Sequence, residues 1–99
     1  YMRSRFKERR DYMYDKLQYL GFELNLPKGA FYVFPSIKNF NMESDEFCEK
    51  LLKEAKVAVV PGSAFGKKGE GHIRISYAYS MDKLKSSMGR MESWIINNF

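Results

Sequence analysis

The chain has 99 residues, of which 44% are hydrophobic and 29% are charged, and its net charge is +5. This length predicts one domain with one modest core, and the balance of apolar and charged residues excludes a disordered chain. No apolar run approaches the roughly 20 residues that span a bilayer, so we expect no membrane partner. The single cysteine, Cys48, excludes an intrachain disulfide and suits a reducing compartment, so we expect a cytoplasmic protein.

The first part of the chain predicts a long helix followed by two strands. Residues 1–20 carry apolar side chains at helical spacing, and Gly21 is a natural helix stop because it tolerates a positive φ. Residues 22–26 alternate between apolar and polar side chains, as in a short strand. Residues 27–29 have the composition of a turn, and residues 30–34, which include three aromatic side chains, predict the second strand.

The second part predicts a helix, two strands and a final helix. Ser44 begins the helix, with two acidic residues behind it at the positive end of the helix dipole. Residues 57–60 and 72–79 predict strands, and Ser80 caps the last helix. The order α-β-β-α-β-β-α predicts an α+β, two-layer domain with helices packed on one face of a small sheet. The predicted core consists of Phe6, Met13, Leu17, Leu20, Phe47, Leu51, Leu52, Ala55, Leu84, Met88, Met91 and Ile95.

The glycine-rich segment 62–69, GSAFGKKG, superficially resembles a phosphate-binding loop. That motif needs four residues between its glycines and a Ser or Thr after its lysine. Here three residues separate Gly62 from Gly66, and Lys68 occupies the hydroxyl position. A predicted strand follows, so no helix N-terminus faces a phosphate. We therefore interpret the segment as a flexible connection between strands.

The positive charge and the aromatic segment 28–34, KGAFYVF, raise the alternative of a basic module that binds single-stranded RNA. RNA-recognition strands have an aromatic and a small residue between the glycine and the central aromatic, whereas this chain has only Ala30 there. Phe31 and Tyr32 are adjacent in the predicted strand, so they point to opposite faces and cannot both stack on bases. Nucleic acid is therefore a disfavoured partner. A stand-alone module that binds RNA or a protein partner stays as the alternative.

Metal and nucleophile sites find little support, because His72 and Cys48 are single and far apart and no metal-ligand spacing occurs. Arg74, between two isoleucines in a predicted strand, is more informative. A guanidinium at a fixed place on a sheet can hold a carboxylate through two parallel hydrogen bonds. The alternating pattern by itself is equally typical of a surface arginine on the polar face of a strand, and that is the commoner case.

Two separated motifs connect these pieces. They are LPKGAFYVFPSI at 26–37 and VAVVPGSAFGKKGEGHIRISYA at 57–78, preceded by the helical RSRFKERRDYMYDKLQYLGF and followed by a closing helix. In this order and spacing the chain resembles the C-terminal small domain of class I pyridoxal-phosphate aminotransferases, the fold-type-I enzymes of the aspartate aminotransferase superfamily. The resemblance covers essentially all 99 residues.

The resemblance implies that Arg74 binds the α-carboxylate of the substrate and that Phe65 lies near the substrate side of the cofactor pocket. It implies a parent enzyme that transfers an amino group between an amino acid and a 2-oxo acid, in amino-acid metabolism or biosynthesis. Such parents use pyridoxal phosphate and are usually homodimers. Segment 28–34 would then be a core strand of the small domain.

The resemblance also implies what this chain lacks. In the family the catalytic lysine, the aspartate at the pyridine nitrogen and most phosphate ligands lie upstream, in the large domain. None of the eleven lysines here lies in the serine-rich sequence typical of that lysine. We therefore expect residues 1–99 to be a single domain that docks on its own large domain. We expect it to supply a substrate clamp, to hold no cofactor stably, and to be inactive alone.

Overall fold

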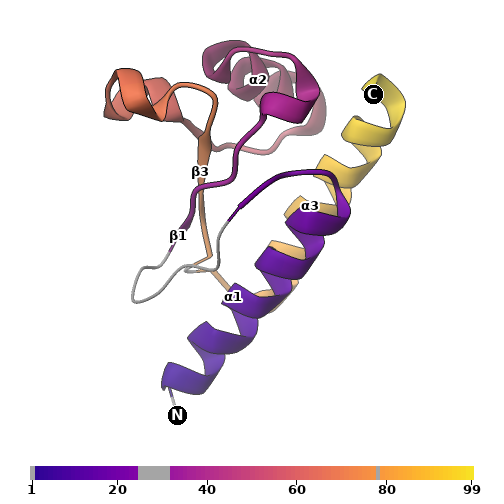
Figure 1. Cartoon of the computed structure of the whole chain (residues 1–99). Helices are drawn as coiled ribbons and strands as arrows, with labels where there is room; N and C mark the ends of the chain where they lie inside the picture. Colours follow the sequence, from indigo (N-terminus) through magenta and orange to yellow (C-terminus); the bar gives the residue numbers. More distant parts are fainter. Residues whose placement is uncertain (1, 25–31, 78) are drawn as a thin grey trace.

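The computed structural model describes residues 2–24, 32–77 and 79–99 (Figure 1). The helices are α1 (Met2–Tyr19), α2 (Ser44–Lys50) and α3 (Met81–Asn98). The strands are β1 (Tyr32–Val33), β2 (Val60–Pro61) and β3 (Ile73–Ser76). Short 3-10 turns are η1 (Lys38–Phe40), η3 (Gly62–Phe65) and η4 (Lys67–Gly69), and the π-helical turn η2 (Leu51–Ala55) extends α2.

The strands form an antiparallel sheet in the order β1-β3-β2. The central strand β3 pairs Ser76 with Tyr32 on one edge and Arg74 with Val60 on the other. Its two isoleucines are buried, whereas Arg74 and Ser76 are partly exposed. Because side chains alternate along a strand, one face of the sheet lines the core and the other points outward. The predicted α+β class is confirmed.

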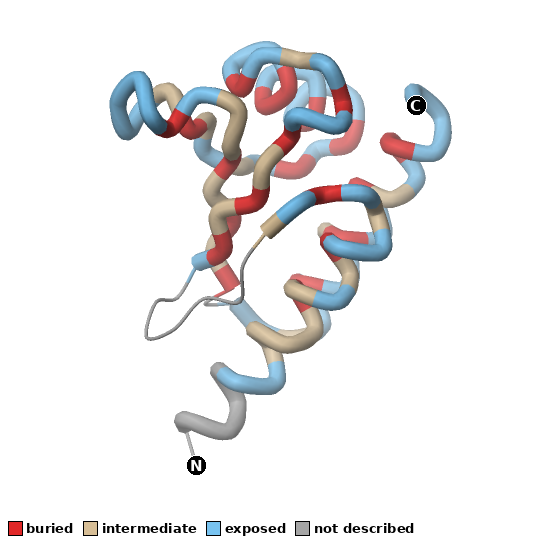
Figure 2. Tube along the Cα trace, in the orientation of Figure 1, coloured by how far each residue is buried: buried red, intermediate tan, exposed pale blue. Residues whose placement is uncertain are grey.

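The core lies between the helices and the inner face of the sheet, where Figure 2 shows the buried residues gathered. α1 packs on both β1 and α3, and Lys16 on α1 forms a 2.9 Å ion pair with Glu92 on α3. The predicted core is confirmed for Met13, Leu17, Phe47, Leu51, Ala55, Leu84, Met88, Met91 and Ile95. Leu52 was predicted wrongly: it is 53% exposed, because η2 directs Leu51 and Ala55 inward and turns Leu52 out.

The predicted strands are longer than those observed. Within 22–24, the strand is reduced to one bridge between Glu23 and Ser36, closed by a 2.7 Å hydrogen bond from the Ser36 amide to the Glu23 carbonyl. Segment 57–60 joins the sheet only at Val60. The turn predicted at 27–29 and the side chain of Phe31 lie outside the described residues. Among the residues that are described, no helix is both long and apolar enough to cross a membrane.

The glycine-rich segment after β2 is folded into η3 and η4 rather than being a plain flexible connection. A Cβ atom placed on Gly62 would lie 1.9 Å from the carbonyl oxygen of Gly69, so the two backbones approach more closely than any side chain allows. The Gly62 amide also donates a 2.7 Å hydrogen bond to the His72 carbonyl. The glycines therefore fold the loop back against the start of β3.

We predict that Gly62→Ala lowers the free energy of unfolding by about 1–3 kcal/mol or more, because its methyl group meets backbone that cannot rotate away. The urea midpoint of the 99-residue chain measures this. The control is Gly89→Ala on the exposed side of α3, where a Cβ meets nothing within 4 Å. That variant should gain about 1 kcal/mol through helix propensity. Equal effects of both substitutions would show that the close approach at Gly62 is not tight.

Candidate functional site

The outer face of the sheet carries an arginine flanked by two aromatic rings. The Cζ atom of Arg74 lies 4.7 Å from the centre of the Tyr32 ring and 5.0 Å from the centre of the Phe65 ring. Tyr32 comes from β1 and is diagonal to Arg74 across the strand pair, and Phe65 ends η3. The ring faces attract the cation and limit where its long side chain can go. We call Arg74 with Tyr32 and Phe65 the arginine clamp.

The guanidinium of the clamp has no carboxylate partner among residues 2–24, 32–77 and 79–99. The ion pairs found there join Arg10 to Asp11, Lys16 to Glu92, Lys38 to Glu23, and Lys50 to Glu46. An arginine has five N–H donors in a planar fork, and aromatic ring faces take none of the in-plane positions. Arg74 is therefore arranged to receive a planar anion such as a carboxylate through two parallel hydrogen bonds.

Two further rings extend the aromatic cluster beyond Phe65. Phe34 packs edge to face on Phe65 at 6.0 Å between centres, and the His72 ring stacks on Phe34 at 5.0 Å, nearly parallel. His72 lies beside the sheet, at the bridge to Ser36. The Nδ1 atom of His72 is buried without a hydrogen-bond partner among the described groups. His72 therefore acts here through its ring face.

Both predicted site residues, Arg74 and Phe65, lie in the arginine clamp. Its third member, Tyr32, was not predicted as a site residue. A signal was available, because Tyr32 and Phe34 are two positions apart on one predicted strand and therefore point to the same face of the sheet. The missing information was the pairing register of β1 with β3. Tyr32 had been weighed as a ring for base stacking. It is 40% exposed, but the Arg74 guanidinium gives its ring a partner within the chain.

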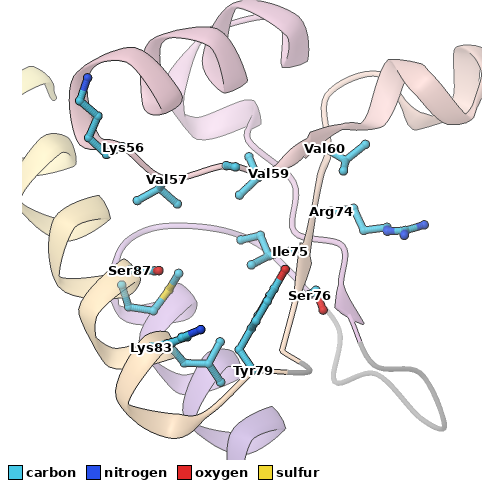
Figure 3. Close-up of a pocket in the computed structure, with 13 residues that line it drawn as sticks. Lys56, Val57, Val59, Val60, Arg74, Ile75, Ser76, Tyr79, Lys83 and Ser87 are labelled. Atoms are coloured by element: carbon cyan, nitrogen blue, oxygen red, sulfur yellow. The ribbon is translucent and has the colours of Figure 1, made fainter.

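A pocket of about 420 Å³ lies beside the clamp, between segment 56–60, β3 and the first half of α3 (Figure 3). Its polar lining comes from Lys56, Arg74, Ser76, Tyr79, Lys83 and Ser87. Figure 3 shows Arg74 extending away from the other labelled side chains, so its stem borders the pocket and its charged end belongs to the outer face. The pocket lining includes no carboxylate. It therefore offers no partner for a protonated ring nitrogen of a cofactor.

Residues 62–72, between β2 and β3, form the loop that carries Phe65, which we call the Phe65 loop. A carboxylate holds this loop near its C-terminal end. Glu70 accepts hydrogen bonds from the backbone amides of Ser44 at 2.8 Å and Gly71 at 2.7 Å, and from the Ser44 hydroxyl at 3.1 Å. These donors hold the pKa of Glu70 below its usual 4.5, the Ser44 amide contributing most. The ionised carboxylate thus ties the loop to the start of α2.

Other candidate chemistry is weak. Burial, together with the nearby carboxylates of Asp45 and Glu70, raises the pKa of the Cys48 thiol to about 12, so Cys48 stays protonated and is no nucleophile at neutral pH. Within the described part of the chain, no group of three or more His, Cys, Asp or Glu residues is placed to hold a metal ion. The arginine clamp is the best-formed candidate site.

Comparison with known proteins gives matches along nearly the whole chain. The family described as aminotransferase class I and II matches residues 1–90. The chain is 48% identical to the probable N-acetyl-LL-diaminopimelate aminotransferase of Bacillus subtilis (strain 168), covering 96% of this chain and 24% of that protein. It is 54% identical to the aspartate aminotransferase of Pyrococcus abyssi, covering 92% and 23%.

Solved structures of aminotransferases are also similar to this chain. The aromatic aminotransferase from Pyrococcus horikoshii OT3 superposes with a TM-score of 0.94 at 49% identity, covering 97% of this chain and 26% of that chain. An aspartate aminotransferase from Thermotoga maritima gives 0.86 at 40% identity, covering 97% and 24%. The chain thus spans about a quarter of the length of the curated relatives it matches.

We predict that the Glu70 contacts make stability sensitive to acid. Because the folded-state pKa of Glu70 is lowered, its contribution is present above the unfolded pKa and is lost as pH falls through the folded value. The urea midpoint of the chain should therefore fall more steeply than that of Glu70→Gln as the pH is lowered through and below the usual pKa of 4.5. Glu49→Gln, an exposed change on α2, should keep the original slope. Parallel curves for Glu70→Gln and the unmodified chain would contradict the prediction.

Proposed function

The chain belongs to the aminotransferase class I and II family, and on that premise we propose that it is the C-terminal small domain of such an enzyme. In this proposal Arg74 binds the α-carboxylate of the substrate and Phe65 borders the same site. The observation that carries it is the arginine clamp: a guanidinium flanked by Tyr32 and Phe65 and lacking an acidic partner among the described residues. Its relatives are aminotransferases about four times as long as this chain.

The chemistry of the proposed reaction suits a clamp of this kind. Amino-group transfer interconverts an amino acid and a 2-oxo acid, and both carry a carboxylate next to the reacting carbon. One guanidinium can therefore hold both the substrate that arrives and the product that leaves. Its two parallel hydrogen bonds fix the position and the rotation of the carboxylate, and so the direction of the bonds at the neighbouring carbon. Rotational freedom removed in this way lowers the barrier of the later steps.

The rings of the clamp contribute by limiting the freedom of Arg74 before the substrate arrives. A free arginine side chain loses about 2 kcal/mol of rotamer entropy when it is fixed, and the contacts with Tyr32 and Phe65 carry part of that loss in advance. A binding group that is already placed binds more tightly and with better-defined geometry. A lysine at the same position would supply the charge without the planar fork.

The family implies pyridoxal phosphate in the full-length enzyme. The residues around Arg74 do not fit this group, because the pocket beside the clamp is lined by lysines and hydroxyls without a carboxylate for the ring nitrogen. We therefore assign the binding of the cofactor, the remaining substrate contacts and most of the dimer contact to the large domain of a homodimeric, cytoplasmic parent.

The test of the role of Arg74 is Arg74→Lys in the full-length protein that contains this segment. Losing the bidentate geometry removes charge-assisted hydrogen bonding of about 1.5–3 kcal/mol, so kcat/KM for amino acids should fall about ten- to hundredfold. We expect KM to rise and kcat to fall. Arg90→Lys is the matched control, because Arg90 lies on the exposed side of α3 and donates to the hydroxyls of Ser86 and Ser87. Unchanged kinetics of Arg74→Lys would refute the carboxylate role.

A separate measurement tests the wider proposal that this chain is part of a cofactor-dependent enzyme. Borohydride reduction fixes lysine-bound pyridoxal phosphate as a stable adduct, which intact mass then detects. We expect a protein several times heavier than 11.7 kDa that carries one adduct. A native species of 11.7 kDa without an adduct would contradict the proposal, and binding of single-stranded RNA or a protein partner would then be tested instead.

A further inference from the structure

We propose that Ser44 and Glu70 form a latch that sets the position of Phe65 and, through it, the orientation of the Arg74 guanidinium. The proposal rests on the substrate-binding role proposed for Arg74. It makes Ser44 and Glu70 positioning residues, because neither contacts the guanidinium. The Ser44–Glu70 latch lies at the start of α2.

The first observation is that both ends of the Phe65 loop meet at one serine. At the far end, Glu70 accepts from the amide and the hydroxyl of Ser44. At the near end, the Ser63 amide donates to the Ser44 hydroxyl oxygen at 3.4 Å, and the Ser63 hydroxyl donates to Asp45 at 2.7 Å. A segment closed in this way has far fewer conformations than a free loop with the same glycines.

The second observation is the burial of Ser44. Its exposed fraction is 0%, and it is the one polar side chain within the buried core of the described residues. A buried hydroxyl is unfavourable unless its hydrogen bonds are made. Both available partners, the Glu70 carboxylate and the Ser63 amide, belong to the Phe65 loop. Moving the loop away would leave this hydroxyl buried and unpaired, so the loop position is energetically defined.

The third observation is the way α2 begins. Glu43 stands at the N-cap position and makes no side-chain capping bond. The first helical amide, that of Ser44, instead donates to Glu70, 26 residues further along the chain. A side chain at the N-cap accepts from the second or third amide of a helix, so this first amide needs an acceptor from elsewhere. Here the capping acceptor comes from the loop, so helix and loop are held in one fixed relation.

A single helical turn, η3, connects the Ser44–Glu70 latch to the arginine clamp. Ser63 lies two residues before Phe65, and the Gly66 amide closes the turn on the Ser63 carbonyl at 3.2 Å. The Phe65 ring is 49% exposed, so the core does not hold it in place. The ring contacts Phe34, which follows β1, and the Arg74 guanidinium on β3. The backbone of η3 therefore decides where the ring meets Arg74, and the latch holds that backbone.

A double-mutant cycle in the full-length protein tests the proposal. Glu70→Gln keeps the shape of the side chain and removes its charge, and we expect kcat/KM to fall about fivefold, chiefly through KM. In a Phe65→Leu background the same change should have little further effect on kcat/KM, because the ring it positions is gone. Its effect on the urea midpoint should be equal in both backgrounds. Glu49→Gln is the surface control and should leave kcat/KM unchanged.

The outcomes separate the two proposals. Unchanged kcat/KM in Glu70→Gln, or effects of Glu70→Gln and Phe65→Leu that simply multiply, would overturn the latch while leaving Arg74 in place. A purely structural role of Glu70 would change the urea midpoint and leave the cycle without coupling, which also overturns it. If Arg74→Lys has normal kinetics, the proposed function fails first. Should Glu70→Gln not fold, Ser44→Ala removes the hydroxyl that donates to Glu70 and carries the same expectations.

Discussion

The pairing register of β3 is the constraint on which the candidate site depends. Tyr32 is paired with Ser76 and Val60 with Arg74, so that both isoleucines of β3 face the core. A slip of one residue would reverse every side chain of the strand. It would bury the Arg74 guanidinium and expose both isoleucines, at a cost that far exceeds typical single interactions. The burial of apolar side chains therefore fixes Arg74 on the outer face, where it meets the two rings.

The sequence allowed the arginine to be found but not its surroundings. Helix periodicity predicted most of the buried residues of the helices but missed Trp94. The predicted cap of α3 is present, since the Ser80 hydroxyl accepts from the Lys83 amide. Those features depend on residues close together in the chain. Tyr32 and Arg74 are 42 positions apart, and strands of two to four residues carry too little alternation to define a register. The contact between Ser44 and Glu70 is hidden for the same reason.

Leu52 illustrates the limit for helices. The sequence predicts one helix that begins at Ser44 and buries Leu52, whereas Leu51–Ala55 form a π-helical turn with a different angular spacing. Whether such a turn forms depends on what the neighbouring elements contribute to the core. Leu52, Tyr19 and Ile96 are all large apolar side chains left exposed. In the proposed parent enzyme, we expect the large domain to cover part of this apolar surface.

The central claim is that the Arg74 guanidinium binds a substrate carboxylate between two aromatic rings. The most direct measurement is a crystal structure of the full-length protein with a bound 2-oxo acid. We expect two nearly parallel N–H···O contacts of about 2.7–2.9 Å from Arg74 to the carboxylate, with Tyr32 and Phe65 still against the guanidinium. A carboxylate bound by other residues, with Arg74 out of contact, would contradict the central claim.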